Sequence, residues 1–372
     1  MQNNIIKHWR ALDRQLIIAY GILLIFSLML VTTTSASVAE KIGLPGNYFS
    51  SKQIIYLLTG SLCVAFFSYL DKKWIKRLGI LGFLINIIML VLVKFYGYEV
   101  KGATRWIRLG GFSYQPSEFI KPFFIITIGW LLSLKYYDNF PGFKMSLLLY
   151  AAVASLLIIQ PDIGMLILIT AVFATQLFVA GLPLIWILFT KIIGFFGIIL
   201  AYFFLPHVTD RINNFIAPAE NENYQVTKSL IAFEEGGFYG KGPGEGTVKQ
   251  FIPDSHTDFI FAVAGEEFGG LICIVIISVF AFIVLSSLMR IKKAEDKFTQ
   301  FAAVGLIVQF GLQAAINMGV TLNLLPTKGM TLPFVSYGGS STIAMSIAAG
   351  MLLSLTKYKT SYFKYKNRQI NI

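Results

Sequence analysis

Residues 252–289 read IPDSHTDFIFAVAGEEFGGLICIVIISVFAFIVLSSLM, a short polar stretch followed by an apolar run of more than membrane length. A helix needs about 20 apolar residues to cross the hydrocarbon core of a bilayer. From Phe259 to Met289 the only charged side chains are Glu266 and Glu267, which are costly there unless they are paired or face a cavity. The segment predicts a transmembrane helix that starts directly after a polar loop.

The composition of the whole chain agrees with this prediction. Of its 372 residues, 56% are hydrophobic and 13% are charged, against roughly a quarter charged in ordinary soluble domains, and the mean hydropathy is +0.69. The net charge of +12 comes from basic residues in short loops and termini, which reflects membrane topology rather than nucleic-acid binding. Cys63 and Cys273 lie in apolar runs as core residues, and no Cys/His group has zinc spacing. The chain is an integral membrane protein.

Apolar runs long enough to span the bilayer, or nearly so, occur about ten times along the chain. They lie near Leu16–Ala36, Ile54–Leu70, Leu78–Val93, Phe119–Leu134, Met145–Ile159, Ile163–Ala180, Leu184–Leu205, Phe259–Met289, Ala302–Leu322 and Ile343–Leu355. We expect an all-α polytopic membrane protein that forms a single integral membrane domain over residues 1–372. One large loop, at about 206–257, separates the seventh and eighth spans.

The distribution of Lys and Arg predicts the orientation. Ten spans place both termini on the same side of the membrane. The segments on that side carry 18 Lys and Arg residues, and the opposite loops carry 12 although they are much longer in total. Because short basic segments stay on the cytoplasmic side, we expect cytoplasmic termini and an extracytoplasmic 206–257 loop.

Asp258 lies where the polar loop meets the apolar run. One interpretation is a helix cap, in which Thr257 or Asp258 accepts hydrogen bonds from the first N–H groups of the following helix. The other is a general base, since a partly desolvated carboxylate at the membrane surface takes up a proton more readily than one in water. The cations and aromatic residues of the neighbouring outer loops favour the base.

The third loop and the helix start that follows it carry several of these charges. Trp106 lies between two arginines, Arg105 among them, which suits an anchor at the membrane interface or an anion site, because Arg forms bidentate hydrogen bonds with phosphate. The sequence QPSE at 115–118 is a good helix start, which places Glu118 and Lys121 one turn inside the membrane. These two side chains form an internal ion pair or belong to a functional site.

The ninth loop, PTKGMTLPFVSYGGSS at residues 326–341, combines prolines and glycines next to two apolar runs. Irregular backbone at membrane depth is tolerated only where it is buried in protein or lines a cavity. Lys328 on this loop is a candidate clamp for an anionic headgroup, and the alternative is a single solvated lysine.

Two other outer segments allow a local explanation. Residues 160–164, QPDIG, form a turn followed by a helix cap. The glycines between 236 and 246 predict either a phosphate-binding loop or turn-rich packing, and they have neither Walker nor Rossmann spacing. Together the outer loops supply one candidate base, several cations and aromatic anchors, which fits a lipid substrate with an anionic, phosphorylated headgroup.

Six runs of the chain carry a family resemblance: 102–106, 115–121, 160–164, 224–242, 256–269 and 317–341. In these runs the chain resembles the SEDS family (shape, elongation, division and sporulation). The combination of HTDFIFAV at 256–263 with EEFG at 266–269 is the most specific match. Residues 242–249, 253–256 and 326–329 resemble the division type of the family more than the elongation type.

The resemblance implies an activity and a set of site residues. Members of the family polymerise glycan strands of peptidoglycan from lipid II outside the plasma membrane. Their catalytic carboxylate corresponds to Asp258, which we expect to act as the general base. We expect the matching motifs and the large loop to bind substrate through Arg105, Trp106, Glu118, Lys121, Gln160, Asp162, Arg211, Gln225, His256, Lys328 and Ser336.

The resemblance also implies partners and a location. The substrate is lipid II, the undecaprenyl-diphosphate-linked disaccharide pentapeptide, and no nucleic acid is expected. A class b penicillin-binding protein supplies the transpeptidase, alongside other divisome proteins. A divalent cation, Mg²⁺ or Mn²⁺, is a candidate cofactor to which no residue is assigned. The expected location is the bacterial plasma membrane at the division septum.

Two other functions compete with the polymerase. A lipid II flippase would place polar groups near the midplane, often with inverted repeats and broken helices in both halves, whereas the motifs here crowd the outer face. A non-catalytic scaffold that recruits a septal partner would not need a carboxylate among outer-face cations. The sequence favours the polymerase over both.

Overall fold

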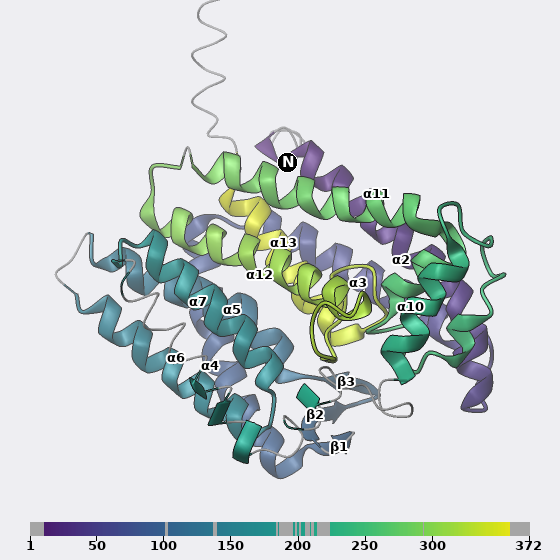
Figure 1. Cartoon of the computed structure of the whole chain (residues 1–372). Coiled ribbons are helices and arrows are strands. Elements are labelled where there is room, and N and C mark those ends of the chain that lie inside the picture. Colours follow the sequence, from purple (N-terminus) through teal and green to yellow (C-terminus); the bar gives the residue numbers. More distant parts are fainter. Residues whose placement is uncertain are drawn as a thin grey trace, which may run out of the picture.

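The computed structural model of the chain describes residues 11–100, 103–136, 140–183, 224–292 and 294–357, together with isolated positions between 185 and 213. Within this part long helices dominate: α2 (Arg14–Lys41), α3 (Tyr48–Tyr69), α4 (Lys72–Tyr96), α5 (Pro116–Leu134), α6 (Gly142–Ile159), α7 (Ile163–Val179), α11 (Ile260–Ile291), α12 (Lys297–Thr321) and α13 (Gly339–Leu355). They form one bundle (Figure 1).

The predicted helical membrane fold is confirmed. Seven of these helices are long and apolar enough to cross a membrane, and α7 and α13 are shorter apolar helices. The helices coincide with nine of the ten predicted runs. The remaining run, Leu184–Leu205, falls largely outside the described residues.

Helix α5 lies in the middle of the bundle and packs against α4, α6, α7, α12 and α13. Glycines allow the closest of these contacts: a methyl group at Gly129 would come within 2.8 Å of Ala302 N on α12, and one at Gly79 within 2.3 Å of Ile126 Cγ2. Small residues let membrane helices approach closely where lipid offers no hydrophobic drive for association. By contrast, α3 and α6 expose large apolar side chains such as Leu62, Phe66 and Leu148, as lipid-facing helices do.

Two ion pairs join helix ends that the predicted topology places in the cytoplasm. Asp13 caps α2 by accepting hydrogen bonds from two backbone N–H groups and forms an ion pair of 2.6 Å with Arg290 at the end of α11. Lys72 at the start of α4 pairs with Asp296 before α12 at 3.2 Å. Burial of the Asp296 carboxylate is outweighed by its hydrogen bonds and by Lys72, so its pKa is lowered.

A small antiparallel sheet in the third loop was not predicted. It consists of β1 (Tyr98–Val100), β2 (Ala103–Leu109) and β3 (Phe112–Tyr114), in the order β1-β2-β3. Gly110 and Gly111, with φ of +52° and +87°, form the two-residue turn between β2 and β3. A Gly-Gly pair is typical of such hairpin turns, so the sequence did contain a signal for this hairpin. The sheet is fixed to α4 by Tyr114, whose hydroxyl donates to Asn86 Oδ1 at 2.5 Å. Burial raises the pKa of Tyr114 to about 12, which keeps this donor protonated.

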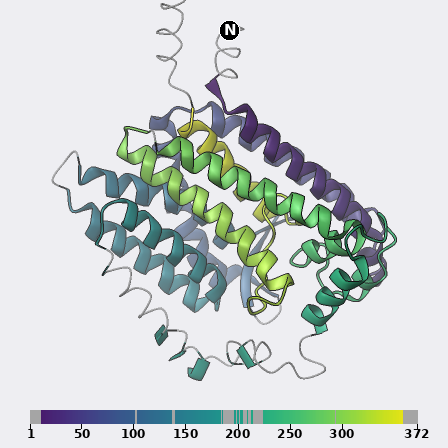
Figure 2. The same cartoon turned by 45° about the horizontal axis from the view of Figure 1, so that its top comes forward.

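The large outer loop also contains helix, where the sequence predicted only loop. Helix α10 (Tyr224–Gly236) and the short 3₁₀ helix η1 (Val248–Phe251) pack on the first part of α11. Figure 2 shows α10 at the end of the bundle where α11 begins. Within α11, Gly269 has a φ of 77° and a ψ of 176°, so the helix is kinked there. The predicted continuous span is therefore divided into a short outer segment, which contains Glu266 and Glu267, and a long apolar one.

Candidate active site

Outer segments far apart in the sequence meet around a small cavity. Its lining comes from Arg105 on β2, from Gln115 before α5, from three residues at the start of α7 and from residues 328–330 of the ninth loop. The three at the start of α7 are Asp162, Gly164 and Met165. The cavity has an enclosed volume of about 20 Å³, enough for an ordered water. Polar atoms make up most of its surface, with Arg105 and Lys328 as cations and Asp162 as a carboxylate.

Asp258 and Lys328, predicted from two different loops, lie at the same place. A methyl group at Gly329 would come within 3.1 Å of Asp258 Oδ2, so this carboxylate lies against the backbone next to Lys328. The stem of Lys328 lies against Gly164, where a methyl group would meet Lys328 Cε at 2.0 Å. Asp258 is partly exposed. A carboxylate and a cation thus flank a single glycine at the outer face.

The structure does not assign the N-cap of the following helix to Asp258 or Thr257. Helix α11 begins at Ile260, and its N-cap is Phe259. The hydroxyl of Thr257 donates to the carbonyl of Asp254 at 3.1 Å. The base interpretation of Asp258 itself stays a prediction, supported by its neighbours.

The ninth loop holds the backbone of the segment that precedes α11. Tyr337 N donates to His256 O at 2.9 Å, and Ser336 Oγ donates to Thr257 O at 2.6 Å. Ser336 is buried, and its hydroxyl also accepts a hydrogen bond from Leu332 N. Ser336 therefore contributes to the shape of the site, and its predicted contact with substrate stays a prediction.

His256 packs among aromatic rings. Its ring centroid lies 4.5 Å from that of Phe49 on α3 and 5.3 Å from that of Tyr337. The side chain is 8% exposed. Substrate binding by His256 also stays a prediction.

Arg105 holds the turn between α6 and α7. Its guanidinium donates to Gln160 O at 3.2 Å and to Pro161 O, and Nη1 lies 3.8 Å from Asp162 Oδ1. Gln160 in turn donates from its side chain to Leu90 O at 2.8 Å. The predicted cap is present, since Asp162 accepts a hydrogen bond from Met165 N. Arg105 thus lines the cavity while it braces this turn.

Glu118 and Lys121 form the internal ion pair that was the alternative to a substrate contact. Their N–O distance is 2.8 Å, and the side chains are 7% and 1% exposed. Lys121 also donates to Gln313 on α12 at 2.7 Å. Neither residue lines the cavity beside Asp258, and their role in substrate binding stays a prediction.

The other predicted residues lie elsewhere. Trp106 is half-buried on β2, opposite Tyr98, and Gln225 lies in the first turn of α10. Arg211 falls outside the described residues.

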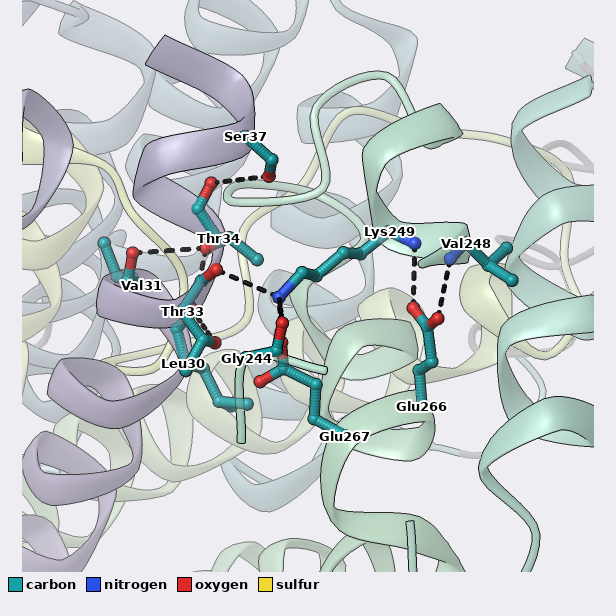
Figure 3. A network of polar contacts seen from close by, with 10 residues as sticks. All are labelled: Leu30, Val31, Thr33, Thr34, Ser37, Gly244, Val248, Lys249, Glu266 and Glu267. Carbon is teal, nitrogen blue, oxygen red and sulfur yellow. Dashed lines mark hydrogen bonds and ion pairs between the residues drawn. The ribbon is translucent and has the colours of Figure 1, made fainter. Parts of the chain in front are cut away.

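A buried lysine that the sequence analysis missed fastens the large loop to the bundle. Figure 3 shows Lys249 reaching from η1 to the space between α2 and α11. Its ammonium group pairs with Glu267 and donates to Thr33 O at 3.1 Å and Gly244 O at 3.2 Å. Lys249 and Glu267 are almost fully buried. The pair joins the two ends of the segment 249–267, which contains Asp258.

Glu266 completes this attachment. Its carboxylate accepts hydrogen bonds from Val248 N at 2.6 Å and Lys249 N at 2.8 Å, which are the free N–H groups at the start of η1 (Figure 3). Of the two alternatives for Glu266 and Glu267, a partner or a cavity, the structure shows partners for both. Two glutamates in an apolar run were the sequence signal for a buried partner, and nothing in the sequence indicated that this partner is Lys249.

The glycines of the large loop serve close packing. A methyl group at Gly236 would come within 2.0 Å of Gly265 O, and one at Gly240 within 2.3 Å of Glu267 O. Both positions lie directly on the backbone of α11. Close packing therefore accounts for Gly236 and Gly240. Turn positions account for three further glycines, whose φ is positive: Gly237, Gly242 and Gly244.

The fold and this site define a polytopic membrane protein in which outer loops gather a carboxylate and cations at the membrane surface. Residues 14–361 match the profile of a family described as cell cycle protein, with the members FtsW, RodA and SpoVE. The chain belongs to this FtsW/RodA/SpoVE family, which confirms the SEDS resemblance.

Sequence relatives and solved structures agree with this membership. The chain is 38% identical to a probable peptidoglycan glycosyltransferase FtsW of Caulobacter vibrioides, over 94% of this chain and 90% of the relative. A probable peptidoglycan glycosyltransferase FtsW of Trichlorobacter lovleyi is 37% identical, over 89% of each chain. The fold is similar to a chain of a peptidoglycan synthase complex that coordinates polymerization and crosslinking, with a TM-score of 0.76, 23% identity and coverage of 93% of this chain and 98% of the other. It is also similar to the rod shape determining protein RodA of Thermus thermophilus, with a TM-score of 0.68, 22% identity and coverage of 94% and 99%.

We predict that Lys249→Met lowers the midpoint of thermal unfolding of the purified protein. The substitution keeps the apolar stem and leaves the buried Glu267 carboxylate without its cation, which typically costs about 3–5 kcal/mol. The double variant Lys249→Met/Glu267→Leu should recover much of the loss, because neither charge of this pair is then left buried without its partner. Lys241→Met is the control, since its ion pair with Glu235 is solvent-exposed. Equal midpoints for Lys249→Met and Lys241→Met would contradict the role of the buried pair.

Proposed function

We propose that this protein is a peptidoglycan glycosyltransferase that polymerises lipid II into glycan strands on the outer face of the plasma membrane, with Asp258 as the general base. The observation that carries the proposal is the position of the Asp258 carboxylate against Gly329, directly beside Lys328 and the cavity that Arg105 lines. The family membership and the glycosyltransferase relatives support the same reaction class.

Asp258 acts on the acceptor sugar. The C4 hydroxyl of one lipid II molecule is a weak nucleophile, and a positioned base accelerates its attack by roughly a hundred- to ten-thousandfold. Asp258 takes the hydroxyl proton while the oxygen forms a bond with the anomeric carbon of the donor. The bond from that carbon to the diphosphate breaks, and undecaprenyl diphosphate leaves. Direct displacement inverts an α-linked donor to a β-linked product.

The cations of the cavity act on the leaving group. The diphosphate needs no acid, since it is already a good leaving group, but it gains negative charge as the bond breaks. Lys328 and Arg105 line the cavity next to the proposed base, where fixed positive charge stabilises the transition state. Arg105 already holds the 160–162 turn, so Lys328 is the better candidate for a direct contact with the diphosphate.

A divalent cation stays a prediction of the resemblance. Among the described residues, no three His, Cys, Asp or Glu side chains gather as a metal site. Asp162 is the one carboxylate among the residues that line the cavity, and Arg105 lies beside it. These residues do not form a prepared metal site, and the mechanism above assigns no step to a metal.

The two competing functions are less well supported. A flippase needs polar binding groups near the midplane, whereas the proposed base and the cavity cations lie on outer segments. A scaffold has no need for a carboxylate held beside a lysine. Neither explains why these two side chains flank Gly329.

We predict that Asp258→Asn abolishes polymerisation and leaves folding intact. Asn has the same shape and cannot take up the proton at neutral pH. Purified protein with fluorescent lipid II and gel analysis of glycan ladders provides the measurement. Asp254→Asn is the matched control, because Asp254 lies in the same turn with a φ of +57°, a conformation that Asn adopts readily. Near wild-type glycan synthesis by Asp258→Asn would show that another group is the base.

We predict that Lys328→Met lowers kcat/KM about tenfold to a hundredfold, because a hydrogen bond between charged partners is worth about 1.5–3 kcal/mol. Met keeps the stem that packs on Gly164 and removes the ammonium group. Lys228→Met is the control, since Lys228 is an outer-loop cation that lies over the rings of Tyr224 and Phe251 rather than at the cavity. An unchanged kcat/KM in Lys328→Met would exclude the contact with the diphosphate.

We further propose that the protein works at the division septum with a class b penicillin-binding protein. The largest stretch of this chain between predicted spans is the outer loop of about 206–257, too short for a transpeptidase domain. The similar fold in a complex that coordinates polymerization and crosslinking supports such a partner. Co-expression with the cognate transpeptidase should give a complex that co-purifies and makes glycan faster. Absence of both effects would exclude the partner.

A further inference from the structure

Helix α12 carries three buried amides on one face. Gln309, Gln313 and Asn317 are spaced by four residues, so their side chains project from the same side of the helix. All three are at most 1% exposed. Their partners differ: Gln309 donates to the sulfur of Met345 at 3.3 Å, whereas Gln313 donates to the carbonyl of Thr331 at 3.1 Å.

Asn317 makes the most unusual contacts of the three. Its Nδ2 donates to Met330 O at 2.6 Å and to Asp258 O at 2.8 Å. A side-chain amide nitrogen carries two hydrogens, so one group serves two carbonyls that are 72 residues apart in the sequence. The reversed amide would turn its oxygen toward two acceptors, which fixes the orientation of the side chain.

These two carbonyls lie at the proposed site. Met330 follows Gly329, the residue against which the Asp258 carboxylate lies, and Lys328 precedes it. The carbonyls of residues 256 and 257 are held by the ninth loop, through Tyr337 and Ser336. The carbonyl of Asp258 is held by α12, through Asn317. Asn317 therefore connects the base segment and the Lys328 segment to the same rigid helix.

We propose that Asn317 is a positioning residue for glycosyl transfer, which sets the separation between Asp258 and Lys328. The inference rests on the proposed function. Asp258 must reach the attacking hydroxyl while Lys328 reaches the diphosphate that leaves on the other side of the anomeric carbon. Asn317 acts through the backbone carbonyls of Asp258 and of Met330, two residues after Lys328, and does not touch the substrate. A displacement of about 1 Å in such an arrangement costs about a hundredfold in rate.

The test uses the full chain, co-purified with its transpeptidase partner and supplied with lipid II. Two variants with the same branched shape remove the donor: Asn317→Leu makes no hydrogen bond, and Asn317→Asp presents an acceptor when ionised and one donor when protonated. Gln309→Leu removes a buried amide from the same face of α12 and is the control. Initial rates give kcat and KM, and thermal unfolding gives the folded fraction.

We expect both Asn317 variants to lose about tenfold to a hundredfold in kcat per folded molecule, with a nearly unchanged KM. The kcat of Asn317→Asp, relative to the wild-type protein at the same pH, should rise as the pH falls, because protonation restores one donor. Asn317→Leu should show no such rise. Gln309→Leu should keep a kcat close to that of the wild-type protein.

Two results overturn the positioning role. One is an unchanged kcat in both Asn317 variants, and the other is an equal loss of kcat in Gln309→Leu. Asp258→Asn is measured in parallel, so that its inactivity beside active Asn317 variants rejects the positioning role and keeps the base. A wild-type protein that makes no glycan, alone or with its partner, rejects the proposed function itself.

Discussion

Backbone N–H and C=O groups that are buried away from water must find partners inside the protein, and this constraint governs the outer end of the molecule. Residues 254–259 and 326–338 have no regular helix or strand. Their polar groups are paired with each other and with α12, through hydrogen bonds to three consecutive carbonyls at residues 256–258. The proposed base therefore lies on a segment whose irregular backbone is held at three consecutive carbonyls.

Buried charged side chains also need partners inside the protein, and their removal from water costs more free energy than that of backbone groups. Lys249 with Glu267, and Lys121 with Glu118, are ion pairs removed from water. Desolvation offsets much of the attraction in such pairs, so they are weak evidence for stability. Each of them instead joins separate parts of the structure. Lys249 ties the large loop to α2 and α11, and Lys121 ties α5 to α12. Their value lies in fixing which segments meet.

Glycine plays a related part at the site. Gly329 lets the Asp258 carboxylate lie against the ninth loop, and Gly164 lets the stem of Lys328 pass the start of α7. A larger residue at either position would move one of the two charged groups away from the cavity. The proposed catalytic arrangement thus depends on two glycines that carry no chemistry of their own.

The sequence by itself determined nine of the helices of the described residues, and it predicted their orientation and the segments that carry the proposed chemistry. These predictions rest on local signals that do not require knowledge of the fold. They are the apolar runs of spanning length, the asymmetry of Lys and Arg between the two sides, and the position of Glu266 and Glu267 within an apolar run. The short sheet was missed because two of its strands have only three residues each, and boundaries and short elements are the least predictable from sequence. Helix α10 is amphipathic and was missed because it lies within a segment interpreted as loop. Only the tertiary structure decided that Asp258 and Lys328 share Gly329, that Glu118 and Lys121 pair internally, and that Lys249 and Asn317 hold the site together. These contacts join residues many positions apart, and no spacing in the sequence encodes the distance between them.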